Sequence, residues 1–295
     1  PGSCVFLPVM SAITPPVTST HRQTPAPAVS VIMNCRNGER YLREAIDSVF
    51  AQTYGDWEII FWDNLSTDAS ADIARAYGER VKYFRGGPLR LYAARNRAVE
   101  QSRGRYVGFL DADDVWLRRK LELQLPRFEQ DPEVGLVYSN GEAFADTGGY
   151  KVRFRRPQPE GAIFRGLLAH YVMGLHTVMI RRSAYEACDG FDETMNASGD
   201  ADLFLRICRR SKAAYVHAVT ARHRDHPASD GACHPEWLVA EADAILRRMR
   251  AEEPDFDFTY APEVTRFVLR SRMTFVVGTW RKGDASSARR QLWAY

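Results

Sequence analysis

The stretch RYVGFLDADDVW, residues 105–116, places an apolar run directly before three carboxylates. An apolar run of this length, bounded by polar turn-forming residues, predicts a buried β-strand. Asp111, Asp113 and Asp114 follow it within four positions. Three carboxylates this close repel one another, so a cation or water has to compensate their charge. The stretch therefore predicts a strand that ends at a charged edge of a sheet.

The sequence on either side of this stretch alternates between two periodicities. Short apolar runs predict strands, and the segments between them carry apolar residues at helical spacing. The predicted strands are VSVIM (29–33), WEIIFW (57–62), VKYF (81–84), RYVGFL (105–110) and VGLVYS (134–139). The predicted helices cover residues 39–52, 69–77, 91–101 and 117–130. Such alternation predicts an α/β fold with a mostly parallel sheet and helices on both faces.

Polar residues stand where three of these strands end. Asn34, Asp63 and Asp111 each follow an apolar run. In open α/β sheets, ligands bind at the carboxyl ends of the strands. Asn and Asp are also common turn-formers, so local geometry would explain any one of the three alone. Together they predict a ligand site along one edge of the sheet.

Composition excludes several classes of protein. The chain has 295 residues and a formal net charge of +3, and it contains no long basic run of the kind that binds nucleic acid. No apolar stretch approaches the roughly 20 residues that a membrane-spanning helix needs. The five cysteines are scattered without a Cys-x-x-Cys pair, which favours a reducing, cytoplasmic compartment over a disulfide framework or structural zinc.

The acidic cluster at 111–114 admits three chemical interpretations. An Asp-x-Asp at a strand end can hold Mg²⁺ or Mn²⁺, which prefer oxygen ligands and share their sites with substrate phosphates. The cluster also fits the Asp-x-Asp signature of haloacid-dehalogenase-type phosphatases, but that signature belongs on the first strand, and three strands precede it here. A solvated turn is the third interpretation. Since the sequence has no glycine-rich phosphate loop, a bound diphosphate would need a cation on Asp113 and basic side chains.

Five sequence blocks, in order, resemble the motifs of family 2 glycosyltransferases with the GT-A fold. The blocks are VSVIMNCRNGERYLREAI (29–46), QTYGDWEIIFWDNLSTDAS (52–70), LYAARNRAVEQSRGRYVGFLDADDVW (91–116), VMIRRSAYEACDGFDE (178–193) and SGDADLFLRI (198–207). The resemblance covers residues 29–229. It implies a Rossmann-like, mostly parallel sheet flanked by helices, and transfer of a sugar from a nucleotide-diphosphate donor, UDP-linked above all.

The resemblance also implies a division of the chain. Residues 1–28, rich in Pro, Ser and Thr, are expected to form a flexible tail. Residues 29–232 are expected to form the catalytic domain, with a nucleotide-binding half at 29–140 and an acceptor half at 141–232. Residues 233–295 are expected to be a helical extension.

The resemblance assigns nucleotide contacts to the strand ends. Asp63 would accept a hydrogen bond from the ring N–H of uracil, and Asn34 and Arg36 would flank the nucleoside. Arg36 stands where the family usually has an aromatic residue, and a guanidinium can stack on a pyrimidine in its place. Arg90 would lie near the nucleotide, and Asp111 would reach the ribose or the metal through water.

Further residues are assigned to the metal and its loop. Asp113 would bind Mn²⁺ or Mg²⁺ directly, and His226 matches a histidine that the family often places near the diphosphate and the ion. Arg95 is expected to orient the acidic loop through an ion pair. Asp114 is expected to cap the following helix.

Asp200 is the predicted general base of an inverting transfer. Such a reaction needs one carboxylate to take the proton of the acceptor hydroxyl, because the diphosphate leaving group requires a metal and not a second acid. The family often has Glu-Asp at this point, whereas this chain has Gly199 and Asp200. Asp202 is expected to serve structure. A non-catalytic nucleotide-binding module of the same fold remains the alternative function.

The sequence leaves open which surface the C-terminal segment binds. From residue 264 to 293 apolar residues are interleaved with arginines. Such a basic amphipathic helix can pack on the catalytic domain, join two copies of the chain as a homo-oligomer, or lie peripherally on an anionic membrane. The acceptor is expected to be a carbohydrate or a lipid-linked molecule, as in the synthesis of surface polysaccharides or glycoconjugates.

Overall fold

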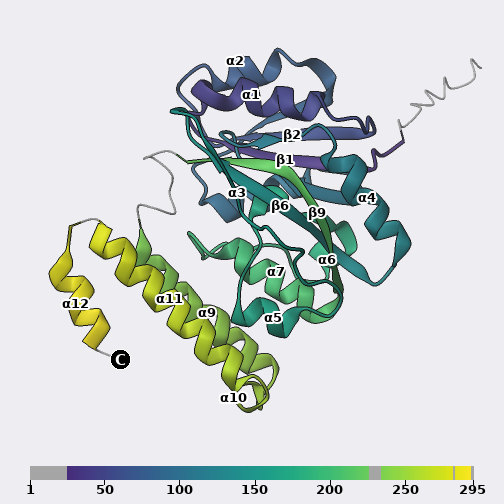
Figure 1. Cartoon of the computed structure of the whole chain (residues 1–295). Helices are drawn as coiled ribbons and strands as arrows, with labels where there is room; N and C mark the ends of the chain where they lie inside the picture. Colours follow the sequence, from purple (N-terminus) through teal and green to yellow (C-terminus); the bar gives the residue numbers. More distant parts are fainter. Residues whose placement is uncertain (1–24, 226–233, 282, 294–295) are drawn as a thin grey trace, which may run out of the picture.

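The computed structural model describes residues 25–225, 234–281 and 283–293. A single curved sheet forms the centre, helices cover both of its faces, and a long helical hairpin lies at one side (Figure 1). The strands are β1 (Val29–Cys35), β2 (Trp57–Asp63), β3 (Val81–Arg85), β4 (Tyr106–Phe109), β5 (Val115–Trp116), β6 (Val134–Phe144), β7 (Tyr150–Val152), β8 (Met179–Arg181) and β9 (Lys212–Arg224).

The sheet has a parallel half and a mixed half. Its strand order is β3-β2-β1-β4-β8-β6-β9-β5, with β7 paired to β6. The first four strands of this order are parallel, and β6 and β9 are parallel to each other. β8 is antiparallel to both β4 and β6, and β5 is antiparallel to β9. The predicted α/β sheet flanked by helices is confirmed, and the antiparallel direction of β5 and β8 is a feature that the sequence pattern did not indicate.

Helices fill the connections between the strands. They are α1 (Glu39–Phe50), α2 (Ser70–Arg75), α3 (Leu91–Glu100), α4 (Lys120–Gln130), α5 (Phe164–Ala169), α6 (Arg182–Glu186), α7 (Gly199–Arg210), α9 (Pro235–Glu252), α10 (Phe256–Thr259), α11 (Ala261–Arg281) and α12 (Ala285–Trp293), with 3-10 turns at Gly78–Arg80 and Leu175–Thr177. The four helices predicted before residue 131 are all present and are shorter at their ends than the pattern suggested.

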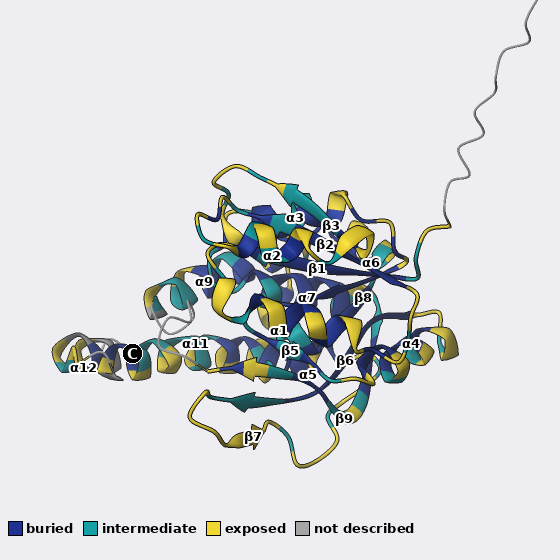
Figure 2. Cartoon of the chain, turned by 90° about the horizontal axis from the view of Figure 1, so that it is seen from above, coloured by how far each residue is buried: buried dark blue, intermediate teal, exposed yellow. Residues whose placement is uncertain are grey.

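The two faces of the sheet build two apolar cores. Alternate side chains of a strand point to opposite faces. Val31 of β1 therefore packs with Leu42 and Ile46 of α1, whereas Ile32 packs with Val99 of α3 on the other side. Figure 2 shows the central strands buried and the outward faces of the helices exposed. The sheet thus holds the strand ends in fixed positions, because both of its faces are packed.

The C-terminal helices extend one of these cores. α9 and α11 lie side by side and run in opposite directions, and α12 lies beside the last turns of α11 (Figure 1). Val264 and Phe267 of α11 are buried in the same core as Ile245 and Met249 of α9. The predicted packing of the C-terminal helical segment on the rest of the protein is therefore confirmed for one face of α11. No helix in the described part of the chain is long and apolar enough to cross a membrane.

Candidate functional site

The carboxyl ends of three neighbouring parallel strands form the candidate site. β1 lies between β2 and β4, and Cys35 at the end of β1 is opposite Asp63 at the end of β2. Asp111 comes two residues after the end of β4. The register therefore brings Asn34, Asp63 and Asp111 to one edge of the sheet, as the sequence predicted.

Asn34 carries an unusual pair of polar atoms at this edge. Among the described residues neither its amide nitrogen nor its amide oxygen has a hydrogen-bond partner, although both are buried. Trp62, its register partner on β2, has an indole N–H in the same condition. A buried polar group without a partner costs about 1–3 kcal/mol, so such groups mark places where a ligand or water is bound. Trp62 is a candidate site residue that the sequence analysis missed, because a tryptophan in an apolar run is read as core.

Asp63 is more enclosed than its predicted role suggests. Its side chain has no exposed surface, one oxygen accepts from the amide of Ser66 at 2.7 Å, and the other accepts from the hydroxyl of Tyr83 at 2.5 Å. The turn that it holds contains Leu65 with φ of 62°, an unusual value for a branched residue. Each carboxylate oxygen has a second lone pair, so the group can still accept from a base if Tyr83 or the turn moves.

Arg95 compensates the first carboxylate of the acidic cluster. Its buried guanidinium, on α3, donates to Asp111 at 2.6 Å. A charge-assisted bond of this kind is stronger than a neutral one and fixes the orientation of both groups. The ion pair that the sequence analysis expected is present.

Asp200 lies in the first turn of α7 within the electrostatic reach of the same arginine. Burial raises the pKa of Asp200 above the ordinary range of an aspartate, and the positive charge of Arg95 opposes that rise. The ring of Tyr92 explains why the preceding residue is a glycine. A Cβ atom on Gly199 would come within 2.7 Å of this ring. The close approach of Tyr92 therefore excludes the glutamate that the family often has there.

Tyr171 is a group within the electrostatic reach of Asp200 that the sequence pattern did not indicate, and Arg270 lies beside it. The hydroxyl of Tyr171 is buried without a hydrogen-bond partner in the described chain, and one guanidinium nitrogen of Arg270 on α11 is in the same condition. Tyr171 interacts electrostatically with Asp200, with Arg153 and with Arg270. The region connecting β6 to β8 showed no clear periodicity, so nothing in the sequence pattern singled out Tyr171, whereas Arg270 belongs to the basic C-terminal segment whose partner was left open.

Asp202 has the structural role that was expected. Its carboxylate is fully buried and accepts from Arg206 of the same helix at 2.9 and 2.5 Å. Arg248 of α9 contacts the other oxygen at 2.5 Å. Asp202 therefore ties α7 to the C-terminal hairpin.

The prediction for Asp114 was wrong. It does not cap a helix, since α4 begins at Lys120 with Arg119 at its N-cap position. The buried carboxylate instead accepts from the ring of His223 at 3.0 Å and from the backbone N–H of Arg224 at 3.0 Å, and the ring of His176 lies 3.5 Å away. The two-residue strand β5 causes the difference, because it pairs with the long strand β9 and brings Asp114 to the histidines.

The titration of this cluster follows from burial and charge. The Asp114 carboxylate raises the pKa of His223 to about 9, so the imidazolium is the favoured form at neutral pH. Burial lowers the pKa of His176 well below its usual value and keeps that ring neutral. The cluster therefore combines a charged pair with one neutral imidazole.

Arg224 at the end of β9 contacts the backbone of the acidic loop. Its guanidinium donates to the backbone carbonyl of Asp113 at 3.0 Å and pairs with the carboxylates of Glu44 and Asp146. The side chain of Asp113 is half-buried at the edge of the sheet. The loop is thus clamped between α3, through Arg95, and β9, through Arg224.

The remaining predicted residues have simpler surroundings. Arg36 is exposed just after β1. Arg90 is exposed at the N-cap of α3, where it donates to the carbonyl of Thr194 at 3.0 Å. His226 lies outside the described residues.

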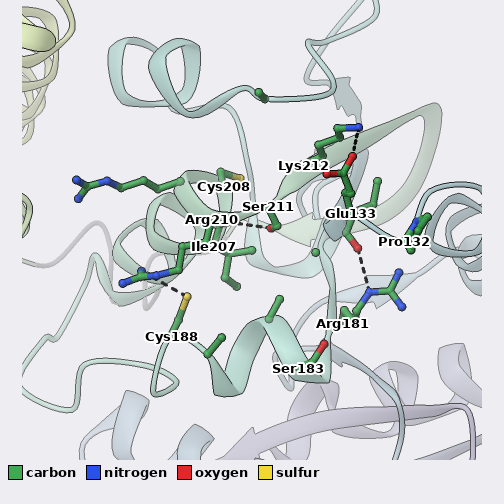
Figure 3. A pocket seen from close by; sticks show the side chains of 16 residues that line it. Pro132, Glu133, Arg181, Ser183, Cys188, Ile207, Cys208, Arg210, Ser211 and Lys212 are labelled. Carbon is green, nitrogen blue, oxygen red and sulfur yellow. Dashed lines mark hydrogen bonds and ion pairs between the residues drawn. The ribbon is translucent and has the colours of Figure 1, made fainter. Parts of the chain in front are cut away.

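A surface cavity of about 480 Å³ lies at the opposite edge of the sheet. Figure 3 shows its lining, which includes Glu133 before β6, Arg181 at the end of β8, Cys188 after α6, and Arg210 and Lys212 around the start of β9. Because β6 and β9 begin there, the cavity faces away from the strand ends. None of the predicted site residues within the described ranges lines it.

The donor atoms at the acidic edge suit a divalent cation. One ligand atom each from Asp114, His176 and His223 lie within 4.8 Å of one another, and Asp113 is the next residue along the loop. Carboxylates suit Mn²⁺ and Mg²⁺, whereas imidazoles favour transition metals. The described cluster therefore offers carboxylate and imidazole ligands to a divalent cation without selecting one.

Comparisons with known proteins agree with this geometry. Putative glycosyltransferase EpsE of Bacillus subtilis is 29% identical over 255 residues, which cover 82% of this chain and 90% of EpsE. Putative teichuronic acid biosynthesis glycosyltransferase TuaG of the same organism is 34% identical over 160 residues, covering 53% of this chain and 63% of TuaG.

Solved structures show the same fold. TarS residues 1–349 of S. aureus, in complex with UDP-GlcNAc, superposes with a TM-score of 0.60 at 16% identity over 85% of this chain and 81% of that one. Mannosyltransferase PcManGT of Pyrobaculum calidifontis, in complex with GDP-Man and Mn²⁺, superposes with a TM-score of 0.57 at 17% identity. The match covers 92% of this chain and 80% of that one. Residues 30–188, more than half of the chain, match the sequence model described as Glycosyl transferase family 2. The chain therefore belongs to glycosyltransferase family 2.

Proposed function

We propose that this enzyme is a metal-dependent, inverting glycosyltransferase that moves a sugar from a UDP-linked donor to a hydroxyl acceptor of a surface polysaccharide or glycoconjugate. The observation that carries the proposal is the arrangement around Arg95. This buried guanidinium is bonded to Asp111 at the strand edge and lies in the electrostatic field of Asp200. One arginine thus connects the donor side of the site with the proposed base.

The donor would lie across the strand ends. The unpartnered amide of Asn34 and the indole N–H of Trp62 offer both a donor and an acceptor to a nucleoside. Arg36 and Arg90 are exposed at the same edge and would contact the base and the phosphates. Asp63 would accept from the ring N–H of the base. TarS, which has the same fold, was solved with UDP-GlcNAc and so supports a UDP-linked donor.

Asp200 would take the proton of the acceptor hydroxyl. Its raised pKa makes it a stronger base than an exposed aspartate, and a general base typically contributes roughly 10²–10⁴-fold to the rate. The neighbouring hydroxyl of Tyr171 is available to hydrogen-bond the acceptor. The protein therefore offers one base and one hydroxyl on the acceptor side.

Mn²⁺ or Mg²⁺ would be held by Asp113, which directly precedes Asp114 of the cluster with His176 and His223. His226 is proposed as a further ligand from the sequence resemblance alone. When bound, such an ion acts as a Lewis acid that stabilises the charge of a diphosphate leaving group. PcManGT was solved with Mn²⁺ and supports this part of the proposal. Arg95 and Arg224 would keep the acidic loop in position, whether or not an ion is present.

Thermal unfolding with a panel of nucleotide sugars, with Mn²⁺ or with EDTA, tests donor binding. A ligand that binds only the folded state raises the melting temperature. We expect UDP-sugars to raise it in Mn²⁺ and much less in EDTA. Release of UDP in the presence of candidate acceptors then tests turnover. Binding without any donor hydrolysis or transfer would identify a non-catalytic module instead.

A further inference from the structure

An apolar stripe runs along the outer face of α11. Leu269, Met273, Val277 and Trp280 are 52%, 49%, 42% and 51% exposed. Their spacing of four, four and three residues places them on one side of the helix, over about three turns. Single exposed apolar side chains are common, but a continuous row of four large ones marks an interaction surface.

The described chain does not cover this stripe. The opposite face of α11 carries Val264 and Phe267, which are buried against α9. α12 lies beside the last turns of the helix and buries Val276 and Ala288 but leaves Trp280 half-exposed. The apolar surface of α11 is therefore wider than its neighbours can bury.

The charge of this segment is opposite to that of the rest of the chain. Residues 264–293 contain seven basic residues and one acidic residue, Asp284, which gives a net charge of +6. The whole chain has a net charge of +3, so the remaining residues together carry −3. Arg266 and Arg289 are exposed on α11 and α12. A positive segment with an uncovered apolar row has the chemistry of an interfacial helix.

We propose that α11 and α12 bind an anionic lipid surface, with the apolar stripe inserted among the headgroups and Arg266 and Arg289 paired with lipid phosphates. A second copy of the chain is the other obvious occupant of an apolar stripe. Pairing two copies along α11 would bring two segments of +6 together, whereas an anionic bilayer attracts both features at once. Charge complementarity therefore selects the bilayer.

The surface lies on the acceptor side of the molecule. α9 follows β9 and the acidic edge in the chain, and the end of α11 lies beside the start of α9 (Figure 1). On the inner face of α11, Arg270 interacts with Tyr171, which interacts with Asp200. A bilayer bound to the outer face of α11 would thus lie on the far side of this helix from Tyr171. The lipid-binding inference does not depend on the proposed reaction, because binding is measured without donor or acceptor.

Vesicle flotation tests the inference. The protein is mixed with phosphatidylglycerol-containing vesicles or with phosphatidylcholine vesicles, at low and at high salt, and the bound fraction is measured. We expect binding to the anionic vesicles at low salt, at least tenfold weaker binding at high salt, and little binding to the neutral vesicles. Protein that stays free of anionic vesicles at low salt would overturn the inference.

Two double variants separate the apolar and the charged contributions. Leu269→Ser with Trp280→Ser should weaken binding at least tenfold, since it removes the two ends of the stripe. Phe258→Ser is the matched control, because Phe258 on α10 is 91% exposed but lies outside the stripe. A control that weakens binding as much as the double variant would contradict the assignment to α11.

Charge is tested by Arg266→Gln with Arg289→Gln. Each arginine near an anionic surface strengthens binding about fivefold, so this pair should weaken it roughly 30-fold. Arg43→Gln with Arg118→Gln changes the net charge equally at exposed positions outside the C-terminal helices and should have little effect. If light scattering instead finds a dimer that the serine pair dissociates, and vesicles are not bound, a second copy covers the stripe and the inference is wrong.

Discussion

The guanidinium of Arg95 donates a hydrogen bond of 2.6 Å to the carboxylate of Asp111, and it does so from a fully enclosed position on α3. This contact helps to explain how three carboxylates within four residues can have their charge compensated. Arg95 offsets Asp111, and His223 offsets Asp114. Asp113 remains at the edge of the sheet, between two neighbours whose charges are already compensated.

The first prediction concerns Arg95. Arg95→Met keeps most of the side-chain volume but removes the positive charge that lowers the pKa of Asp200. The base must be deprotonated to act, so activity falls as the pH decreases through its pKa. We expect the acidic limb of the kcat/KM profile to move to higher pH in the variant.

Arg97→Met is the matched control for this experiment. Arg97 lies on the same helix but is only half-buried, and it pairs with Glu100 and Glu193. Its replacement should leave the acidic limb in place. An unchanged profile in Arg95→Met would mean that Arg95 does not influence the base.

The second prediction concerns Asp200. Asp200→Asn should lower transfer by roughly 10²–10⁴-fold, because an amide cannot accept the proton of the acceptor. Donor affinity, measured by calorimetry with a UDP-sugar, should stay nearly the same. Asp243→Asn, at an exposed position of α9, is the control. Transfer within a few fold of the parent enzyme would remove Asp200 from the mechanism.

The third prediction links Asp113 to the metal. Asp113→Ala should weaken UDP binding in Mn²⁺ but much less in EDTA, because the ion would connect this carboxylate to the diphosphate. The difference between the two conditions is a coupling free energy, which a double cycle of variant and metal measures. Equal losses in both conditions would show that Asp113 acts only through the structure of the loop.

The fourth prediction concerns stability. Asp202→Ala leaves the buried guanidinium of Arg206 without its carboxylate. Removal of one partner from a buried ion pair costs about 3–5 kcal/mol in the free energy of unfolding. Asp257→Ala breaks an exposed pair with Arg250 and should cost less than about 1 kcal/mol. Urea unfolding of both variants checks the contrast, and similar losses would contradict the buried role of Asp202.

The fifth prediction is a pH dependence. The pKa of His223 is raised from its ordinary value near 6.5 to about 9 by Asp114. A raised pKa of a histidine contributes stability that is complete below the unfolded value and is lost as the pH rises through the folded value. The melting temperature of the metal-free protein should therefore decrease between pH 6.5 and about 9.

His223→Gln tests the assignment. The variant should show a shallower decrease over the same interval, because glutamine does not titrate. His217→Gln is the control, since His217 also lies on β9 but, among the residues that the structure describes, contacts Tyr215 and no carboxylate. A slope that His223→Gln leaves unchanged would place the titrating group elsewhere.

Local sequence patterns were sufficient to predict those structural features that depend on a short stretch of the chain. The alternation of apolar runs and helical segments predicted the parallel half of the sheet, and that half brought Asn34, Asp63 and Asp111 to one edge. The ion pair of Arg95 and the structural role of Asp202 could also be predicted. In each case the side chain and its partner belong to elements that the pattern had already identified.

The error at Asp114 had a physical cause. A helix cap is decided within four residues, whereas the contacts of Asp114 come from His223 and His176, more than 60 positions away. β5 has only two residues, too few to show a strand periodicity, yet it pairs with β9 and brings these groups together. The orphan amide of Asn34 and the burial of Asp63 are likewise consequences of packing that no local pattern expresses.

Strand and helix periodicities and strand ends are local properties, so they were enough to predict the fold class, the family and the edge of the sheet where the polar residues meet. Which face of α11 is buried could not be predicted in this way. Both faces carry large apolar residues, and the choice was made by α9, which covers Val264 and Phe267 and leaves Leu269 and Trp280 exposed. Burial depends on which surfaces meet, and that depends on contacts between segments far apart in the chain.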